Sequence, residues 1–283
     1  MEIAILIVVL MTCVGLLFGL ILAIANKKFE VEVNPLIHMV EDVLPKGQCG
    51  ACGYAGCIAY AEAVVLNEDV APNLCIPGKE AVAKRVAELT GKVAEDLEPR
   101  YAYVNCDGCS DNSVDKYEYD GIKDCIAANI LLNGQKACEY GCLGMGTCVK
   151  NCPFDAIEMG ENNLPFINKN RCTGCGKCQS VCPKKVISMV PIDAHVQVKC
   201  NNKDIRAVSK KFCNVSCLGC GVCAKKCEHE AIKVENNLAV VNNMICIEKC
   251  SNPTCAEKCP TKAMKVIRKQ GEVSEELATS KSC

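Results

Sequence analysis

Cysteine limits what this chain can fold into more than any other residue, because 27 of the 283 residues carry a thiol. In a short secreted protein that density would indicate a disulfide scaffold, but at this length iron–sulfur clusters and zinc sites are alternative ways to hold the chain together. With cysteine set aside, ordinary apolar side chains are too few for a core of this length. Since 27 is odd, one thiol always stays unpaired, and at most six four-cysteine sites can be filled.

The apolar segment at the N-terminus indicates the compartment. Residues Ile3 to Ala25 carry no charge, and at about 1.5 Å per residue their helix would cross the hydrocarbon of a bilayer. A cleaved signal peptide is the alternative, but the run is long and its positive charges, Lys27 and Lys28, follow it. We therefore expect residues 1–26 to anchor the chain in the lipid of the cell inner membrane as a single pass. The positive-inside tendency places the body on the cytoplasmic side, where thiols stay reduced and metal ligation replaces disulfides.

A glycine-rich group of four cysteines follows, within a domain expected over residues 34–98. The spacing is C-x2-C-x4-C-x17-C, and the interleaved glycines let the backbone pass close to a bulky ligand. Apolar periodicity predicts helices over residues 58–66 and 79–89. We expect a small helical domain that binds one [4Fe–4S] cluster through four residues: Cys49, Cys52, Cys57 and Cys75.

The rest of the chain contains a repeat. The stretch AIEMGENNLPFINKNRC (156–172) matches AIKVENNLAVVNNMIC (231–246), including an Asn-Asn turn between two short strands. The repeat predicts two tandem bacterial-ferredoxin-like modules in an α+β chain that begins with a transmembrane helix. The expected boundaries are a connector over 99–135, module 1 over 136–192, a connector over 193–211, module 2 over 212–268 and a tail over 269–283.

The run Cys172, Cys175, Cys178, Cys182 favours clusters over zinc. Its spacing, C-x2-C-x2-C-x3-C-P, is that of bacterial ferredoxins, in which the fourth cysteine ligates the neighbouring cluster. Zinc sites use two C-x2-C pairs and need no third close thiolate. Residues 217–227 repeat the spacing, with glutamate in place of the proline.

In module 1 the first run lacks its middle cysteine, because Met145 stands there. Cys138, upstream of the run, is the natural substitute. Crossing the fourth ligands within each module predicts four more clusters, which make five with the N-terminal one. The predicted sets are Cys138, Cys142, Cys148 with Cys182; Cys172, Cys175, Cys178 with Cys152; Cys217, Cys220, Cys223 with Cys259; and Cys246, Cys250, Cys255 with Cys227.

Three further cysteines form a compact set that lacks one ligand for a possible sixth cluster: Cys106, Cys109 and Cys125. Cys138, Cys200 or Cys213 could supply that ligand, and the alternative is that the three are free thiols. Cys213 takes the place in module 2 that Cys138 takes in module 1, so either Cys213 or Cys220 is spare there.

Three longer stretches carry a resemblance to a known family. They are CGACGYAGCIAYAEA, PNLCIPGKEAV and KACEYGCLGMGTCVKNCPFDAI, in this order after the N-terminal helix. Together they resemble the B subunits of Rnf complexes, membrane-bound ferredoxin:NAD+ oxidoreductases that couple electron flow to sodium or proton transport. The doubled module is similar to the clostridial and acetogen form. The resemblance implies a translocase component that accepts electrons from reduced ferredoxin and relays them to the other Rnf subunits, on the membrane and NADH sides.

Positive charge gathers over residues 184–233, which hold ten Lys or Arg and four Asp or Glu. Ferredoxins are commonly acidic, so this stretch is a candidate docking surface that would raise the association rate. The alternative is that it compensates the negative charge of nearby clusters. The candidate docking residues are Lys184, Lys185, Lys210, Lys211, Lys225 and Lys226.

The sequence contains no dinucleotide fingerprint, since Gly144-Met145-Gly146 lacks the third glycine, so we expect no flavin or nicotinamide and no catalytic residue on this chain. The formal charge of −1 and the lack of tryptophan argue against a nucleic-acid partner. We expect the N-terminal cluster, tethered nearest the membrane, to pass electrons to the membrane subunits. Two alternatives stay open: an electron-transfer component of a hydrogenase or formate dehydrogenase type, and a zinc-binding structural protein.

Overall fold

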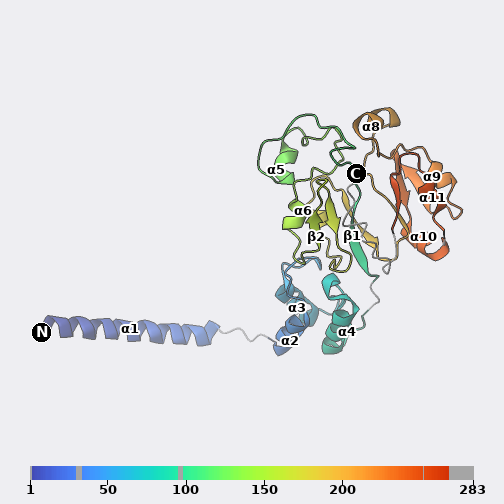
Figure 1. Ribbon diagram of the computed structural model, residues 1–283. Coiled ribbons are helices and arrows are strands. Elements are labelled where there is room, and N and C mark those ends of the chain that lie inside the picture. The colour runs from blue at the N-terminus through green and yellow to red at the C-terminus, as the bar shows by residue number, and fades with distance from the viewer. Residues whose placement is uncertain (1, 30–33, 95–97, 251, 268–283) are drawn as a thin grey trace.

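The computed structural model describes residues 2–29, 34–94, 98–250 and 252–267, so the predicted tail over 269–283 lies outside the described residues. A long helix, α1 (Glu2–Phe29), stands apart from the rest of the protein (Figure 1). Among the described residues it is the one helix long and apolar enough to cross a membrane, and none of its apolar stretch is buried. Lys27 and Lys28 in its last turn suit the negative end of the helix dipole.

A small helical domain follows α1. Its elements are α2 (Pro35–Val43), α3 (Cys57–Leu66), the short helix η1 (Ile76–Gly78) and α4 (Lys79–Thr90), which confirm the two helices predicted here. Val40, Val64 and Val86 fill the core between these helices and are fully buried. The domain lies directly against module 1, because a Cβ at Gly47 would come within 3.2 Å of the Phe154 ring.

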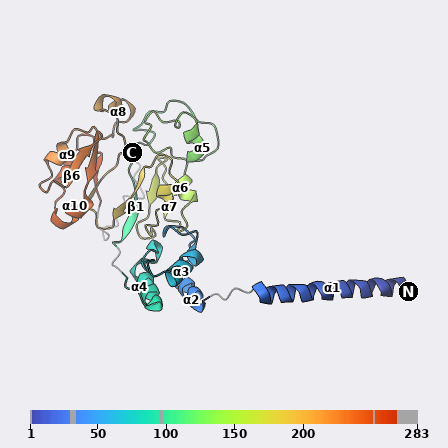
Figure 2. The ribbon, with the colours of Figure 1, turned by 180° about the vertical axis from the view of Figure 1, so that it is seen from behind.

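In both views module 1 lies above the helical domain, with module 2 at its side (Figures 1 and 2). It is built around an antiparallel hairpin in which Ile157 pairs with Ile167. This hairpin is the predicted pair of short strands. The elements are α5 (Cys125–Ile130), α6 (Thr147–Lys150), β2 (Ile157–Met159), β3 (Pro165–Ile167), α7 (Lys177–Ser180) and β4 (Ile187–Pro191).

Module 2 repeats the hairpin, with Ile232 paired to Val241. Asn236 and Asn237 form the predicted turn, and both have positive φ, at 49° and 60°. Asparagine tolerates this left-handed conformation better than most residues. The elements are α8 (Arg206–Phe212), α9 (Val222–Lys225), β6 (Ile232–Glu235), β7 (Leu238–Val241), α10 (Asn243–Lys249), α11 (Thr254–Glu257) and β8 (Met264–Val266).

Each module gains a strand from the connector that precedes it. β1 (Arg100–Val104) runs antiparallel to β4, and β5 (Val196–Val198) runs antiparallel to β8. The segments expected as connectors over 99–135 and 193–211 therefore belong to the modules in the folded chain.

One backbone turn occurs four times, each time three residues after the last cysteine of a run. These cysteines are Cys152, Cys182, Cys227 and Cys259. There φ is 47° at Asp155, 51° at Lys185, 53° at Glu230 and 54° at Lys262. The N–H of each of these residues donates to the carbonyl oxygen of the cysteine, with N···O distances of 3.1 to 3.4 Å. A residue with a Cβ adopts positive φ only at a cost, so a shared turn of this kind marks the point where the chain must fold back.

Candidate iron–sulfur sites

The helical domain forms the first cysteine site around its glycine-rich loop. Gly50 and Gly53 have φ of 69° and 87°, which lets the loop turn tightly. The Oε1 atom of Gln48 accepts a hydrogen bond from the N–H of Cys57 (3.0 Å), where α3 begins. The loop therefore holds its thiols at the start of a helix, whose N–H groups favour negative charge.

The four predicted thiols of this site, here site 1, lie near one another: Cys49, Cys52, Cys57 and Cys75. Burial is the main cause that raises the pKa of Cys75 to about 11, and the three other thiols act in the same direction. Since thiolates are the form that binds metal, the site needs positive charge to hold them ionised. Iron bound by the four thiolates would supply that charge.

Site 2 lies in module 1 and brings together the set expected from the crossed ferredoxin pattern: Cys152, Cys172, Cys175 and Cys178. Burial raises the pKa of Cys178 to about 12, and neighbouring thiols of this set add to the rise. Two of the sulfurs accept backbone hydrogen bonds, from Ala156 N–H to Cys152 Sγ and from Ala102 N–H to Cys172 Sγ, both at 3.4 Å. Such N–H···S bonds tune the potential of a cluster.

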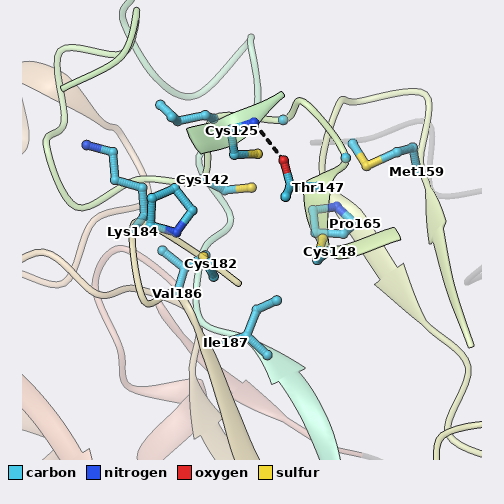
Figure 3. A pocket seen from close by; sticks show the side chains of 14 residues that line it. Cys125, Cys142, Thr147, Cys148, Met159, Pro165, Cys182, Lys184, Val186 and Ile187 are labelled. Atoms are coloured by element: carbon cyan, nitrogen blue, oxygen red, sulfur yellow. Dashed lines mark hydrogen bonds between the residues drawn. The ribbon is translucent and has the colours of Figure 1, made fainter. Parts of the chain in front are cut away.

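Site 3 is a pocket of module 1 (Figure 3) with four cysteines in its lining: Cys125, Cys142, Cys148 and Cys182. The sequence expectation placed Cys138 in this set, but Cys138 lines a different pocket. The structure therefore differs from the expectation in one ligand, and Cys125 takes the expected place of Cys138.

The start of α5 explains how Cys125 reaches site 3. Asp124 caps the helix, accepting hydrogen bonds from Ile126 N–H (2.8 Å) and Ala127 N–H (3.1 Å). The buried Thr147 hydroxyl donates to Asp124 Oδ2 (2.8 Å) and accepts from Cys125 N–H (2.6 Å), the bond drawn in Figure 3. Because Thr147 begins α6, this pair of bonds ties the start of α5 to site 3.

Met145 stands in a loop whose backbone is the same as in the complete runs. Gly144 and Gly146 on either side of it have φ of 74° and 73°, and Gly174 and Gly176 in the next run have 74° and 75°. The loop of module 2, around Cys220, has 60° and 71° at its two glycines. Module 1 therefore keeps the loop but takes its ligand from another segment.

Module 2 brings together its two predicted sets. A pocket is lined by the first, here site 4: Cys217, Cys220, Cys223 and Cys259. The second, here site 5, is Cys227, Cys246, Cys250 and Cys255. Burial raises the pKa of Cys246 to about 11, and the three other thiols of site 5 add to the rise. The N–H of Ala231 donates to Cys227 Sγ (3.3 Å), as Ala156 does to Cys152 in module 1.

The set predicted for a possible sixth cluster does not come together as expected. Cys125 belongs to site 3, and Cys109, which is buried, is not part of any pocket lining described for these sites. Cys106 instead lines a pocket together with three cysteines named above as candidate fourth ligands or spare thiols: Cys138, Cys200 and Cys213. The position of Cys106 after β1 gave no sign of this, because β1 itself was not predicted.

The donor sets fit iron–sulfur clusters. Among the described residues, no three His, Cys, Asp or Glu side chains lie close enough together to hold a single metal ion. The thiols instead surround open pockets, as in sites 3 and 4. A cluster several ångströms across needs thiolates at separate corners, whereas zinc draws its four ligands to one point.

Comparison with known proteins agrees with this chemistry. Residues 44–77 match the family model described as "Putative Fe-S cluster", and residues 136–189 match "4Fe-4S dicluster domain". The chain is 60% identical over 94% of both chains to the B subunit of the proton-translocating ferredoxin:NAD(+) oxidoreductase complex of Clostridium ljungdahlii. It is 42% identical to the Na(+)-translocating counterpart of Acetobacterium woodii, over 87% of this chain and 73% of that one.

A third relative is the B subunit of the ion-translocating oxidoreductase complex of Methanosarcina acetivorans, 38% identical over 89% of this chain and 94% of that one. Each of these matches extends over 87% or more of this chain. The two alternatives of another membrane oxidoreductase and a zinc protein are thereby set aside. The chain belongs to the family of B subunits of Rnf complexes, the ion-translocating ferredoxin:NAD(+) oxidoreductases, and is an iron–sulfur electron-transfer protein of that kind.

Proposed function

We propose that this chain accepts electrons from reduced ferredoxin at module 2 and relays them one at a time, through module 1 and site 1, to the membrane subunits of an Rnf complex. The five sites described above hold one [4Fe–4S] cluster each. The observation that carries the proposal is the close succession of cysteine sites from module 1 to the helical domain beside α1. The protein fixes the spacing of the clusters and tunes their potentials, while the clusters themselves change oxidation state.

Sites 1, 2 and 3 are near neighbours. Burial raises the pKa of Cys175 in site 2, and Cys49 of site 1 acts in the same direction. Cys148 of site 3 likewise adds to the rise at Cys178 of site 2, where burial is again the main cause of the raised pKa. Thiols that influence one another in this way mark clusters that would stand side by side, as electron transfer requires.

The outer side of module 2 is the candidate entry. Cys220 of site 4 is exposed, so a cluster there would lie near the surface. Four candidate docking lysines of module 2 are exposed as well, Lys210, Lys211, Lys225 and Lys226, and so is Lys185 of module 1. The sixth, Lys184, is half-buried and donates to the Asn133 carbonyl oxygen (2.6 Å), so it has a structural role. A basic surface beside an exposed cluster suits an acidic electron donor.

The membrane end is the helical domain. α1 joins this domain and would lie in the lipid of the cell inner membrane, with the body on the cytoplasmic side. Site 1 is then the cluster nearest the membrane subunits. The ion, sodium or proton, would be moved by those subunits, since this chain offers one candidate span among its described residues.

A salt series on ferredoxin reduction tests the entry. In the intact complex, Lys210→Gln/Lys211→Gln should lower the stopped-flow rate about threefold at low ionic strength, and the difference should vanish at high salt. Lys79→Gln/Lys123→Gln removes the same charge elsewhere and should leave the rate unchanged. If the rate changes neither with salt nor with the substitution of Lys210 and Lys211, docking at this surface is contradicted.

The order of transfer can be tested at site 1. Cys52→Ala should remove this cluster, leave reduction of the remaining clusters by ferredoxin intact and stop electrons from reaching the membrane subunits. Because cluster binding contributes to folding, the iron content of the other sites is the folding control. Loss of ferredoxin reduction itself, in a variant that keeps those sites, would place the entry at site 1 and reverse the proposed direction.

A further inference from the structure

Two buried hydroxyl groups beside site 2 have no hydrogen-bond partner among the described residues, those of Tyr101 and Thr173. Tyr101 lies in β1 and is 2% exposed. Thr173 directly follows Cys172, the first cysteine of its run. Because it is costly to bury a hydroxyl without a partner, two such groups at one site indicate an acceptor that the polypeptide itself does not supply.

The Tyr101 side chain lies against Cys172 of site 2. Cys172 packs on the buried group that Tyr101 forms with residues 190, 194 and 267. Burial raises the pKa of the Tyr101 hydroxyl well above its usual value, and Cys172 acts in the same direction. The hydroxyl therefore keeps its proton at neutral pH and is available as a donor near the Cys172 sulfur.

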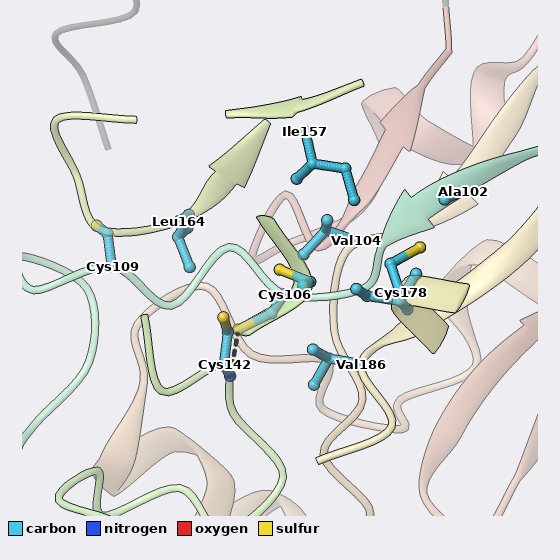
Figure 4. Close-up of a cluster of buried hydrophobic side chains, with 11 residues drawn as sticks. Ala102, Val104, Cys106, Cys109, Cys142, Ile157, Leu164, Cys178 and Val186 are labelled. Atoms are coloured by element: carbon cyan, nitrogen blue, oxygen red, sulfur yellow. Dashed lines mark hydrogen bonds between the residues drawn. The ribbon is translucent and has the colours of Figure 1, made fainter. Parts of the chain in front are cut away.

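The backbone of β1 runs along the same site. Ala102 N–H donates to Cys172 Sγ (3.4 Å). Ala102 also belongs to one cluster of buried side chains with Cys178, another thiol of site 2 (Figure 4). β1 thus presents a backbone donor and, from the preceding residue, a side-chain hydroxyl to site 2.

The Thr173 hydroxyl lies near a third sulfur of site 2. Burial raises the pKa of Cys175, and the Thr173 side chain acts in the opposite direction, as a donor to a thiolate does. The other three runs have an aliphatic residue directly after their first cysteine: Leu143, Leu218 and Ile247. Among the four runs, this donor is therefore peculiar to site 2.

A positive charge lies next to the two hydroxyls. The Nζ atom of Lys169 is 4.7 Å from the centroid of the Tyr101 ring, a cation–π contact. A turn holds this lysine close to site 2, because Cys172 N–H donates to the Asn168 carbonyl oxygen (2.9 Å). A cation fixed at this place favours negative charge on the neighbouring sulfurs.

Site 5, the equivalent site of module 2, has other side chains at these places. Tyr101 pairs with Val190, and the carbonyl oxygen of His195 accepts from Ile267 N–H (2.7 Å). Val190 and Ile267 each lie eight residues after the last cysteine of their run, so His195 corresponds to Tyr101. Around the first cysteine of site 5, the counterparts of Lys169 and Thr173 are Asn243 and Ile247.

We propose that Tyr101, Thr173 and Lys169 raise the reduction potential of site 2, so that site 2 holds an electron more firmly than site 5. The two hydroxyls donate to sulfur at site 2, and the ammonium of Lys169 lies behind the Tyr101 ring. Reduction adds one negative charge to the site, which these three groups stabilise, while no bond forms or breaks and both hydroxyl protons stay in place.

The inference rests on the proposed function in one respect, since site 2 must hold a [4Fe–4S] cluster. Site 2 is next to site 1, because Cys49 of site 1 adds to the rise in the pKa of Cys175, of which burial is the main cause. A high potential at site 2 would therefore make it the place where an electron waits before it passes through site 1 to the membrane subunits.

A redox titration of the full chain without oxygen, followed by EPR, tests the role of Tyr101. The signal that disappears in Cys178→Ser identifies site 2. Tyr101→Phe should lower the equilibrium constant for reduction of site 2 about tenfold, which moves the potential by about 59 mV to a more negative value. Tyr103→Phe is the matched control, because it removes a hydroxyl from the neighbouring ring, 6.5 Å away between centroids, and should leave the potential unchanged. A native potential in Tyr101→Phe would overturn the role of its hydroxyl.

The other two residues have their own variants. Thr173→Val and Lys169→Met should each move the potential of site 2 to a more negative value, by less than Tyr101→Phe does. Lys169→Arg keeps the charge over the ring and should keep the native potential. If Lys169 had only a structural role, Lys169→Met would lower stability without moving the potential, and that result would overturn its part in the proposal.

Electron–nuclear double resonance of the reduced protein in D2O detects the donors directly. One exchangeable deuteron coupled to the spin of site 2 should be lost in Tyr101→Phe and kept in Tyr103→Phe. The same set of deuterons in Tyr101→Phe would contradict a hydrogen bond from this hydroxyl.

Iron analysis separates this inference from the proposed function. If Cys178→Ser keeps the native iron content, site 2 holds no cluster and the proposed function fails. If Cys178→Ser loses about four iron per chain while the Tyr101, Thr173 and Lys169 variants keep native potentials, only the tuning of site 2 is overturned.

Discussion

Modules 1 and 2 differ in how they complete the first cysteine run. In module 2 the middle ligand candidate, Cys220, lies within the run and is exposed. In module 1 the same loop carries Met145, and Cys125 reaches the pocket from α5. The backbone of the two loops is alike at both flanking glycines. The comparison teaches that the loop defines where a ligand must be, while the segment that supplies the thiol can change.

The change requires an added segment in module 1. Residues between β1 and Cys138 form α5, its Asp124 cap and the stretch in which Val114 N–H donates to the Phe212 carbonyl oxygen of module 2. Module 2 has a shorter connection at the corresponding place. The added segment covers site 3, whereas site 4 keeps an exposed cysteine. Because exposure to solvent changes the potential of a cluster, equivalent positions in the two modules can serve different steps of a relay.

The largest expected effect comes from moving the fourth thiol of site 3 from α5 into the loop, where module 2 has it. Cys125→Ser should remove the cluster of site 3, with a loss of about four iron per chain. Adding Met145→Cys to that variant should restore the iron, because the loop already has the backbone of a complete run. Iron analysis and EPR of the full chain measure both results.

The same exchange can fail in an informative way. Cys138→Ser is the matched control, since the sequence alone placed Cys138 in this set. Suppose that Cys138→Ser, and not Cys125→Ser, abolished the EPR signal of site 3, and that Met145→Cys restored it. The fourth ligand of site 3 would then be Cys138.

Thr147 should matter next, because module 2 has Val222 at the equivalent position. Thr147→Val leaves Cys125 N–H and Asp124 Oδ2 without their shared partner. These part-buried hydrogen bonds, one of them to a carboxylate, contribute about 1 to 3 kcal/mol. The urea midpoint for cluster loss, followed by absorbance without oxygen, should fall accordingly.

The reverse substitution, Val222→Thr, is the control. Module 2 has no α5 for a hydroxyl at this position to hold, so its midpoint should stay near the native value. Equal effects of the two substitutions would show that the Thr147 bonds do not hold α5 to module 1.

Asp107 lies in module 1 and binds two lysines of module 2. It should contribute less than Thr147 to the free energy of unfolding. It accepts hydrogen bonds from Lys199 (2.9 Å) and Lys265 (3.0 Å), next to β5 and within β8 of module 2. Burial alone would raise the pKa of Asp107, but the two lysines outweigh it and hold the pKa below the usual value. Since both lysines are partly exposed, Asp107→Ala should cost about 1 kcal/mol by urea unfolding.

Asp155→Asn is the matched control for Asp107, because asparagine tolerates the positive φ of this position (47°) as aspartate does. Its carboxylate is 87% exposed and lies 4.0 Å from Arg171, so its removal should have no measurable effect. If both variants unfold at the native urea concentration, the two modules do not depend on Asp107 to stay together.

The smallest expected effect concerns the positive-φ turn that follows the last cysteine of each run. Glu230→Gly removes the cost of a left-handed residue and should stabilise module 2 by about 0.5 kcal/mol. Lys233→Gly, in the exposed part of β6, should destabilise it by a similar amount. Urea midpoints of the pair test the turn, and a destabilised Glu230→Gly would show that its side chain contributes more than its φ costs.

The sequence was sufficient for most of the fold, because short motifs carry local constraints. Cysteine runs with fixed spacing predicted both modules, and the Asn-Asn pair predicted the hairpin turn that Asn236 and Asn237 form. Helices with a clear apolar face, such as α4, were predicted to within a residue. Each of these features depends on neighbours within a few residues.

Features that depend on distant pairing were missed. β1 and β5 are short and lie in stretches expected as connectors, and only their partners β4 and β8 make them strands. Cys125 was grouped with Cys106 because the two are near in sequence, although in the fold they line two different pockets. The four-residue offset shared by Cys138 and Cys213 was visible in the sequence and was the one sign that they belong together.

The backbone hydrogen bond from Val114 N–H to the Phe212 carbonyl oxygen, which joins the segment before α5 to module 2, also has a consequence for biogenesis. Cys106 leaves the ribosome near the start of module 1, directly after β1, and Cys213, which lines the same pocket, follows only after module 1 is complete. A cluster-delivery system that works along the nascent chain could therefore fill sites 1, 2 and 3 in turn, before the pocket that Cys106 and Cys213 share is complete. A ribosome stalled between the two modules would yield a chain that has all the cysteines of sites 1, 2 and 3. That chain would lack sites 4 and 5, and with them the candidate entry for electrons.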